Sequence, residues 1–344
     1  MIILRKSSIY NLLINVYIFI IGYYSFLYAS TSSIDFVNII SIIEDGSPMK
    51  WIREGEVLSG AIILLLYHLF GDNGVFLFNS VVTIIFLKIL YCKSNIKYDD
   101  FFSFIAYILL STIILYNPIY ADFTNQQSRQ FLLLSILIFF LFKEFETREF
   151  KLIKWLLVTI LGTLIHKSAI LLILIFWISI YGITHLKKII KLNINKSILG
   201  IIILLTIFMF FKYDSIYEII QTYLGNEESI NLSIIGTIFS SLGITLSFFF
   251  TLIIVFLLMI QKLFRESKIV LMSISLLSIM PLSIFGISLY EILTRVYKPS
   301  MLLLVMLTFL SLFKERKLFL YLLPIILLLF IMTIMLQYNK FNNI

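Results

Sequence analysis

Long apolar stretches alternate with short polar breaks along the whole chain. A helix needs roughly 20 apolar residues to cross the hydrocarbon core of a bilayer, where only helices and closed barrels satisfy every backbone group. The stretches are continuous rather than alternating residue by residue, which favours helices over a barrel. The pattern therefore predicts an all-α, polytopic membrane protein with about eleven spanning segments, at residues 8–29, 74–92, 100–116, 127–143, 152–166, 168–186, 196–212, 237–261, 268–289, 298–313 and 318–337.

The composition agrees with this class and excludes others. The chain has 344 residues, of which 60% are hydrophobic, and its mean hydropathy is +1.04. We expect a single transmembrane domain over residues 1–344, because no long polar stretch leaves room for a separate soluble one. The net charge of +8 does not indicate a nucleic-acid partner, since the basic residues lie in short loops between apolar segments. Cys92 is the only cysteine, which excludes an intrachain disulfide.

The basic residues predict which loops face the cytoplasm, because cytoplasmic loops carry an excess of Lys and Arg. With the N-terminus inside, 19 of the 27 cations face the cytoplasm and 12 of the 19 acids face outward. We therefore expect a cytoplasmic N-terminus. The first apolar stretch is too long for a signal sequence and lacks a small-residue cleavage site, so we also expect an uncleaved first helix. The 19 cations are Arg5, Lys6, Lys88, Lys93, Lys97, Lys143, Arg148, Lys151, Lys154, Lys187, Lys188, Lys191, Lys196, Lys262, Arg265, Lys268, Lys314, Arg316 and Lys317.

Residues 57–70 are apolar, but they do not fit this orientation as a span. Fourteen residues make a helix of about 21 Å, which is shorter than the roughly 30 Å core. We expect this helix to lie on or dip into the outer leaflet, within a long outer loop at 30–73. The alternative has the N-terminus outside and 57–70 spanning, and it gives the same cation count but places Arg5-Lys6 outside.

Both large outer loops, 30–73 and 213–236, contain an amphipathic segment. Such a segment is typical of a helix that lies in the membrane interface. The apolar faces consist of Phe36, Ile39, Ile40 and Ile43 in the first loop, and of Ile216, Ile219, Ile220, Tyr223 and Leu224 in the second.

Arg129 is the first candidate functional residue. The stretch between Arg129 and Lys143 is only thirteen residues long, so the helix must extend upstream to span, which draws Arg129 below the outer surface. An ionisable group inside the membrane costs on the order of 2–4 kcal/mol, so its presence there indicates a polar partner or a functional role. Gln126 and Gln130 lie near it on the helix, a pattern suited to an anionic head group or a diphosphate. The alternative is an arginine that reaches lipid phosphates or pairs with Asp122.

Two further cationic sites are expected on the outer side. His166 and Lys167 lie at a tight turn between helices, where the histidine binds phosphate, moves a proton or caps the turn; spacing alone favours a structural histidine. Arg295 either forms an ordinary surface pair with Glu291 at i, i+4, or joins Lys298 in adding positive charge to the first site.

Asp35 and Glu56 are the candidate carboxylates of the first outer loop. Either can act as a general base towards a sugar hydroxyl. The alternative is that both lie at helix N-termini, where the helix dipole stabilises acids without any catalytic role. The sequence has no phosphate-cradling glycine loop, no HExxH-type spacing and no nucleophile elbow, so we expect neither a metal nor a cofactor.

Three elements over residues 128–169 carry a family resemblance. They are Ser128-Arg129-Gln130, the basic turn at 143–154, and His166-Lys167-Ser168-Ala169. Together they resemble the EpsG family of Wzy-type polysaccharide polymerases, which typically has an Arg-Gln dipeptide opening one helix and a later His-x-Ser-Ala element.

Matches to the same family extend over roughly residues 30–300. Arg295 precedes Val296 and Tyr297, as the family's later Arg precedes an aromatic residue and a spanning helix. Asp35 and Glu56 fall where the family has an early Asp and a Glu-Pro pair. The chain departs from the family at Val57, where the proline is expected, and at Ile39, where a tyrosine is expected.

The resemblance implies polymerisation of oligosaccharide repeats linked to undecaprenyl diphosphate, on the outer face of a bacterial cytoplasmic membrane. The growing glycan would pass to the terminal hydroxyl of an incoming lipid-linked repeat, with membrane lipids, a chain-length regulator and a flippase as further partners. The implied catalytic residues are Arg129, His166, Arg295, Asp35 and Glu56, and the implied substrate-binding residues are Gln126, Gln130, Lys167 and Lys298.

Other functions fit parts of the same pattern. The outer loop with its short helix resembles the layout of GT-C glycosyltransferases, so a transferase using a polyprenyl-phosphate sugar is the nearest alternative. A flippase is another, although carriers usually have polar groups near the midplane of the membrane. A membrane acyltransferase with His166 as base is the third, and it would need an acyl donor path from the cytoplasm.

Overall fold

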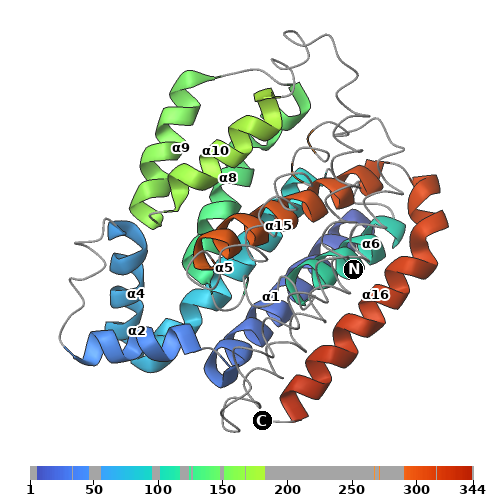
Figure 1. Ribbon diagram of the computed structural model, residues 1–344. Helices are drawn as coiled ribbons and strands as arrows, with labels where there is room; N and C mark the ends of the chain where they lie inside the picture. The colour runs from blue at the N-terminus through green and yellow to red at the C-terminus, as the bar shows by residue number, and fades with distance from the viewer. Residues whose placement is uncertain are drawn as a thin grey trace, which may run out of the picture. The chain divides into compact units, whose positions relative to one another are not determined.

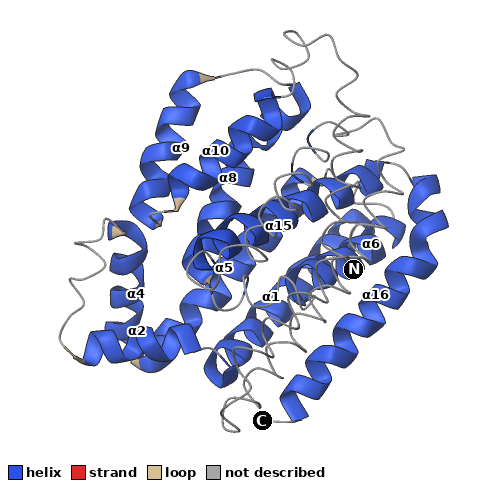
Figure 2. Ribbon diagram, viewed as in Figure 1, coloured by secondary structure: helices blue, strands red, loops and turns tan. Residues whose placement is uncertain are grey.

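The computed structural model describes residues 6–32, 34–45, 56–94, 101–116, 124, 127–147, 151–166, 168–182, 267, 271, 290–314 and 316–342. Every regular element in these ranges is a helix (Figures 1 and 2), which confirms the all-α prediction. The chain divides into two compact units, one formed by residues 1–173 and 309–344 and the other by residues 174–308.

Most of the described helices belong to the first unit. They are α1 (Lys6–Ser32), α2 (Ile34–Glu44), α4 (Val57–Phe70), α5 (Asp72–Lys93), α6 (Phe101–Tyr116), α8 (Ser128–Thr147), α9 (Leu152–Ile165) and α16 (Arg316–Asn342). Two segments cross the boundary between the units: α10 (Ala169–Trp177), which continues as a π-helix over Ile178–Gly182, and α15 (Tyr290–Lys314).

Most of the predicted segments agree with these helices to within a few residues, but α15 begins at Tyr290, before the predicted start at 298, and α16 ends at Asn342, after the predicted end at 337. Residues 57–70 form a helix of the predicted length, α4. The predicted spans at 196–212, 237–261 and 268–289, and the amphipathic segment of loop 213–236, lie outside the described residues.

α1 packs against α5, and the two helices run in opposite directions. Near the start of α5, the Asn79 side chain donates a hydrogen bond to the carbonyl of Ser25 (3.0 Å), near the end of α1. Near the other end of α5, Lys88 is hydrogen bonded to Asn15 of α1. Asn79 is buried, so its hydrogen bond removes the cost of burying an unsatisfied donor, whereas the contact of Lys88 lies at an exposed position.

α6 runs in the same direction as α1. The hydroxyl groups of Tyr17 and Ser111 are 2.8 Å apart, and those of Ser25 and Tyr116, one or two turns further along both helices, are 3.1 Å apart. Since α5 is antiparallel to α1, the three helices alternate in direction as the predicted spans require.

α8 lies parallel to α5 and forms an antiparallel hairpin with α9. The rings of Phe86 and Phe131 have centroids 4.7 Å apart. At the end of α8, the buried Glu144 accepts a hydrogen bond of 2.5 Å from the indole of Trp155 at the start of α9. At the other end of this hairpin, a Cβ added to Gly162 would lie 3.0 Å from Leu133. The small residue therefore lets α8 and α9 approach closely.

α4 folds back on the first part of α5 through a tight turn at Gly71. This glycine has φ +61°, a conformation that side chains with a Cβ rarely adopt. A Cβ on Gly74 would lie 2.0 Å from the carbonyl oxygen of Leu66, so the two helices touch backbone to backbone there. Glu56 precedes α4 and therefore lies at the end of this helix opposite the turn.

α2 is present where an amphipathic helix was predicted, but its apolar face covers protein. The rings of Phe36 and Phe76 meet edge to face with centroids 6.2 Å apart. Phe36 and Ile39 are buried in the protein, and the position of this helix in the membrane interface stays a prediction. Contact with α5 supplies the same apolar burial that a lipid surface would.

The described helices include two that are long and apolar enough to cross a membrane, at Ile9–Thr31 and Asp72–Lys93. Five shorter apolar helices accompany them in the described ranges, at Val57–Phe70, Phe101–Tyr116, Leu152–Ile165, Ala169–Tyr181 and Lys298–Phe313. Large apolar side chains remain exposed along α9, with Ile153 82% and Ile160 61% exposed. Such a surface favours contact with lipid over contact with water.

Candidate functional site

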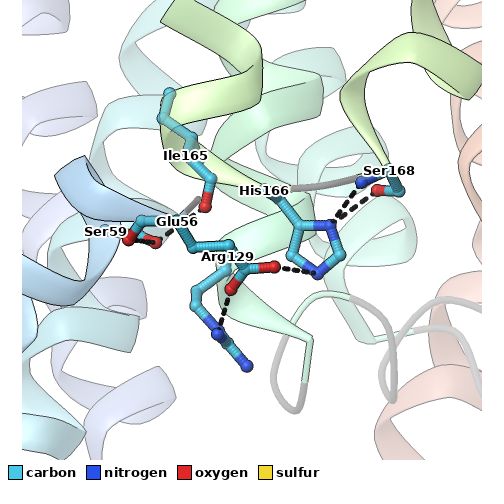
Figure 3. A network of polar contacts seen from close by, with 6 residues as sticks. All are labelled: Glu56, Ser59, Arg129, Ile165, His166 and Ser168. Carbon is cyan, nitrogen blue, oxygen red and sulfur yellow. Dashed lines mark hydrogen bonds and ion pairs between the residues drawn. The ribbon is translucent and has the colours of Figure 1, made fainter. Parts of the chain in front are cut away.

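Three helix ends meet in the first unit, and each carries one polar side chain into the same place. The hairpin of α8 and α9 brings Arg129, in the first turn of α8, to the same end as His166, which directly follows α9. Glu56 directly precedes α4, which packs against α9. Figure 3 shows the three side chains pointing toward one another.

The Glu56 carboxylate is the centre of this cluster. Its Oε2 accepts a hydrogen bond and ion pair from Nη1 of Arg129, and its Oε1 lies 3.4 Å from Nε2 of His166. The side chain of Glu56 is 2% exposed and that of His166 7%, whereas that of Arg129 is 26% exposed. The arginine is therefore the member of the cluster that a ligand can reach from outside.

Glu56 does not use its carboxylate to cap α4. It occupies the N-cap position, yet its side chain makes no capping hydrogen bond there. An acid at a helix N-terminus ordinarily serves the helix itself. Since this one bonds Arg129 instead, the explanation by helix dipole alone is insufficient for Glu56.

The His166 ring is held in one orientation and one tautomer. The backbone N–H of Ser168 donates to Nδ1 of His166 (3.0 Å), and the Ser168 hydroxyl lies 2.8 Å from the same nitrogen. A nitrogen that accepts a backbone N–H carries no proton, so a neutral imidazole must carry its proton on Nε2. That Nε2–H then points at Glu56, as Figure 3 shows.

A second contact joins the start of α4 to the end of α9. The Ser59 hydroxyl donates to the carbonyl of Ile165 (2.7 Å). Ile165 is the last residue of α9, where carbonyls have no partner within the helix. The bond therefore satisfies one of these carbonyls and fixes Glu56 and His166 relative to each other.

The start of α8 is fixed by a chain of buried hydrogen bonds. The hydroxyl of Ser128 donates to Oδ1 of Asn79 (2.6 Å), and the amide nitrogen of Asn79 donates to the Ser25 carbonyl. Ser128 precedes Arg129, so α1 and α5 together hold the backbone from which the arginine extends.

Two amide oxygens within one turn of Arg129 have no hydrogen-bond partner in the described part of the chain. They are Oε1 of Gln127 and Oε1 of Gln130. Gln130 is buried, with 4% of its surface exposed. A buried acceptor left unpaired costs about 1–3 kcal/mol, and one explanation for keeping it is a ligand or water that donates to it.

The structure brings together three of the predicted site residues, Glu56, Arg129 and His166, and places Gln130 beside them on α8. Asp35 lies in the first turn of α2, but its side chain is outside the described residues, as are Gln126 and Lys167.

Arg295 and Lys298 both lie on α15, in the second unit. The side chain of Arg295 is outside the described residues. Their part in a common site with Arg129 therefore stays a prediction.

Sequence reasoning gave no role to Ser59, Gln127 or Ser168. Ser168 was visible as part of the His-x-Ser-Ala element, but its bond to Nδ1 depends on the turn that follows α9. Ser59 carries no sequence signal, because its partner is a backbone carbonyl 106 positions away. The alternative interpretation of Arg129 paired it with Asp122 or with lipid phosphates; in the structure Arg129 forms an ion pair with Glu56.

The chemistry open to this cluster follows from its groups. An exposed guanidinium binds phosphate oxygens through charge-assisted hydrogen bonds, and a carboxylate beside it can accept a proton. The described residues contain no group of three or more His, Cys, Asp or Glu side chains able to hold a metal ion.

Comparison with known proteins gives no match to a family model, to a curated protein or to a solved structure. The likeness to the EpsG family therefore rests on the residues quoted above.

Proposed function

We propose that this protein is a Wzy-type polymerase, which joins oligosaccharide repeats carried on undecaprenyl diphosphate at the outer face of a bacterial cytoplasmic membrane. The observation that carries the proposal is the cluster of Glu56, Arg129 and His166. The resemblance assigns two of these residues to its strongest motifs and the third to the first outer loop, and the fold joins all three.

The groups of the cluster match the needs of the reaction. The acceptor hydroxyl attacks the anomeric carbon of the donor glycan, a new C–O bond forms, and the bond from that carbon to the diphosphate breaks. The departing lipid diphosphate keeps the electron pair, and Arg129 stabilises the charge that develops on it. The hydroxyl proton passes to the carboxylate of Glu56. Both reactants are lipid-tethered, so holding them in one site also lowers the entropic part of the barrier.

The unpaired amide oxygens suit a saccharide ligand. Sugar hydroxyls donate hydrogen bonds, and Oε1 of Gln127 and of Gln130 are buried acceptors beside Arg129. A site built in this way would discriminate against a lipid diphosphate without a glycan, since its buried acceptors would then stay unpaired.

The orientation that this function requires agrees with the charge pattern. With the N-terminus in the cytoplasm and eleven spans, the starts of α5 and α8 and the end of α9 face outward, and the basic turn at 143–154 faces the cytoplasm. Glu56, Arg129 and His166 then all lie on the outer side, where lipid-linked repeats are polymerised.

Deletion of the gene tests this function, with the surface glycan examined on a gel. A polymerase mutant shows single repeats in place of a ladder. Complete loss of glycan would instead favour an earlier step, by a GT-C-like transferase or a flippase, and an unchanged ladder would overturn the proposal. Complementation with Arg129→Ala should not restore the ladder. Lys143→Ala, an exposed cation at the opposite end of α8, is the matched control and should restore it.

A further inference from the structure

The end of α8 opposite the Glu56 cluster carries a second group of charged and aromatic side chains. Lys93, the last residue of α5, has its Nζ 5.0 Å from the centre of the Phe139 ring and 6.0 Å from that of Phe142. Contact of an ammonium group with aromatic faces is favourable. It holds the charge of Lys93 against α8, whereas a lysine at a helix end ordinarily extends into water.

A second lysine is held at the same end of the α8–α9 hairpin. Nζ of Lys154, in the first turn of α9, lies 3.6 Å from Oε1 of the buried Glu144. The other oxygen of this carboxylate accepts the hydrogen bond of the Trp155 indole. The side chain of Lys154 is 28% exposed, so its ammonium group is fixed in place and still open to a ligand from outside.

The two lysines come from different helices and repel each other. The charge of Lys154 acts unfavourably on that of Lys93, and this effect is larger than the favourable one of Glu146 on α8. Two like charges held near each other are stabilised by an anion beside both. Phosphate oxygens accept charge-assisted hydrogen bonds from ammonium groups. The pair of lysines therefore suits a phosphate group.

Exposed apolar side chains continue from these lysines towards the middle of both helices. Phe139, over which Lys93 lies, is exposed, and so is Leu157, one turn after Lys154. Ile160 continues the exposed surface along α9. A surface with a cationic end and an apolar body matches a phospholipid, which has an anionic head group and apolar chains. In the orientation predicted from the loop charges, this end of the hairpin faces the cytoplasm.

We propose that Lys93 and Lys154 bind the phosphate of an anionic phospholipid of the cytoplasmic leaflet. One of its acyl chains lies along the exposed Phe139 and Leu157. The inference goes beyond the proposed function and does not depend on it. An excess of cations in cytoplasmic loops orients a chain without pairing any two of them. Here two lysines from two helices are held beside one exposed apolar surface, and basic sites of this kind between spanning helices bind anionic head groups.

The test uses the full-length protein in detergent, with defined phospholipids added and the bound lipid measured by native mass spectrometry. The wild type should bind phosphatidylglycerol more tightly than phosphatidylcholine with the same acyl chains. Lys93→Gln and Lys154→Gln should each weaken the binding of phosphatidylglycerol about fivefold and leave that of phosphatidylcholine unchanged. Lys93→Arg keeps a cation over the same rings and should bind phosphatidylglycerol as the wild type does.

Lys317→Gln is the matched control, because Lys317 is an exposed cation on the same predicted side of the membrane, in the first turn of α16. A loss equal to that of Lys93→Gln would overturn the site. Equal binding of the two phospholipids by the wild type would also overturn it, and this result needs no variant to fold. Displacement of the bound lipid by an equal concentration of glycerol phosphate would do the same, since the acyl chain would then contribute nothing. The glycan ladder tests polymerisation separately.

Discussion

Glu56 and Arg129 lie 73 positions apart in the sequence and form an ion pair in which the carboxylate is buried and the guanidinium is 26% exposed. The pair joins the start of α4 to the start of α8. Removing one partner of a buried pair costs about 3–5 kcal/mol when both groups are buried, because the other charge is left uncompensated. Here the arginine reaches solvent, so we expect a cost of about 1–3 kcal/mol for Arg129→Gln.

A double-mutant cycle of Glu56→Gln and Arg129→Gln measures this pair. We expect the double variant to be more stable than the sum of the two single changes predicts, with a coupling of about 1 kcal/mol or more, read from thermal or denaturant unfolding in detergent. Additive effects would show that the two side chains do not interact in the folded protein.

His166 should be a neutral imidazole protonated on Nε2, because its Nδ1 accepts the backbone N–H of Ser168. The chain has 3 histidines, so ¹⁵N-histidine spectra with His166→Gln as the assignment variant resolve this ring. Ser168→Ala keeps the backbone N–H and should preserve the tautomer. Ser168→Pro removes that N–H, so the proton of the neutral imidazole should then be found on either ring nitrogen. A proton on Nδ1 in the wild type would contradict the arrangement.

Glu144 and Trp155 form a buried contact at the opposite end of the α8–α9 hairpin, with Lys154 3.6 Å from the other carboxylate oxygen. We expect Glu144→Ala to lower stability by about 1–3 kcal/mol, since it leaves the buried indole N–H without its acceptor. Glu146→Ala, at an exposed position on the same turn, should change stability by less than about 0.5 kcal/mol. Equal losses in thermal unfolding would show that Glu144 does not fix the hairpin.

Gly162 lies where α9 comes closest to α8 and to the start of α10. An added Cβ would be 3.0 Å from Leu133 Cδ1 and 3.1 Å from the Ala169 Cβ, so a larger side chain must push the helices apart. We expect Gly162→Leu to cost about 1–3 kcal/mol and to displace His166, one turn further on. The histidine spectrum would report this as a changed environment of Nε2. An unchanged spectrum and melting midpoint would show that the close contact is not needed.

The sequence predicted the helices well because each needs only a continuous apolar stretch, a local property that the residues display directly. The predicted boundary between residues 57–70 and 74–92 agrees with the end of α4 at Phe70 and the start of α5 at Asp72. The segment predicted from residue 127 agrees with the start of α8 at Ser128. The alternating direction of the predicted spans also places Arg129 and His166 at the same end of the α8–α9 hairpin. These predictions use chain direction and helix length alone.

The partners within the site were not predictable in the same way. Asp122 is the acid closer to Arg129 in the sequence. Only the packing of α4 against α9 shows that Arg129 forms an ion pair with Glu56. The roles of Ser59 and Ser168 depend on a carbonyl and a ring nitrogen that become neighbours when the helix ends meet. The apolar face of α2 illustrates the same limit, because amphipathicity does not distinguish a lipid surface from the side of α5.

The polymerase activity is tested with the purified protein in lipid vesicles, supplied with one defined repeat unit on undecaprenyl diphosphate. We expect glycans of two and more repeats together with released undecaprenyl diphosphate, no product from Arg129→Ala, and normal product from Lys143→Ala. Failure of the folded wild type to join repeats, or equal product from Arg129→Ala, would contradict the proposed function.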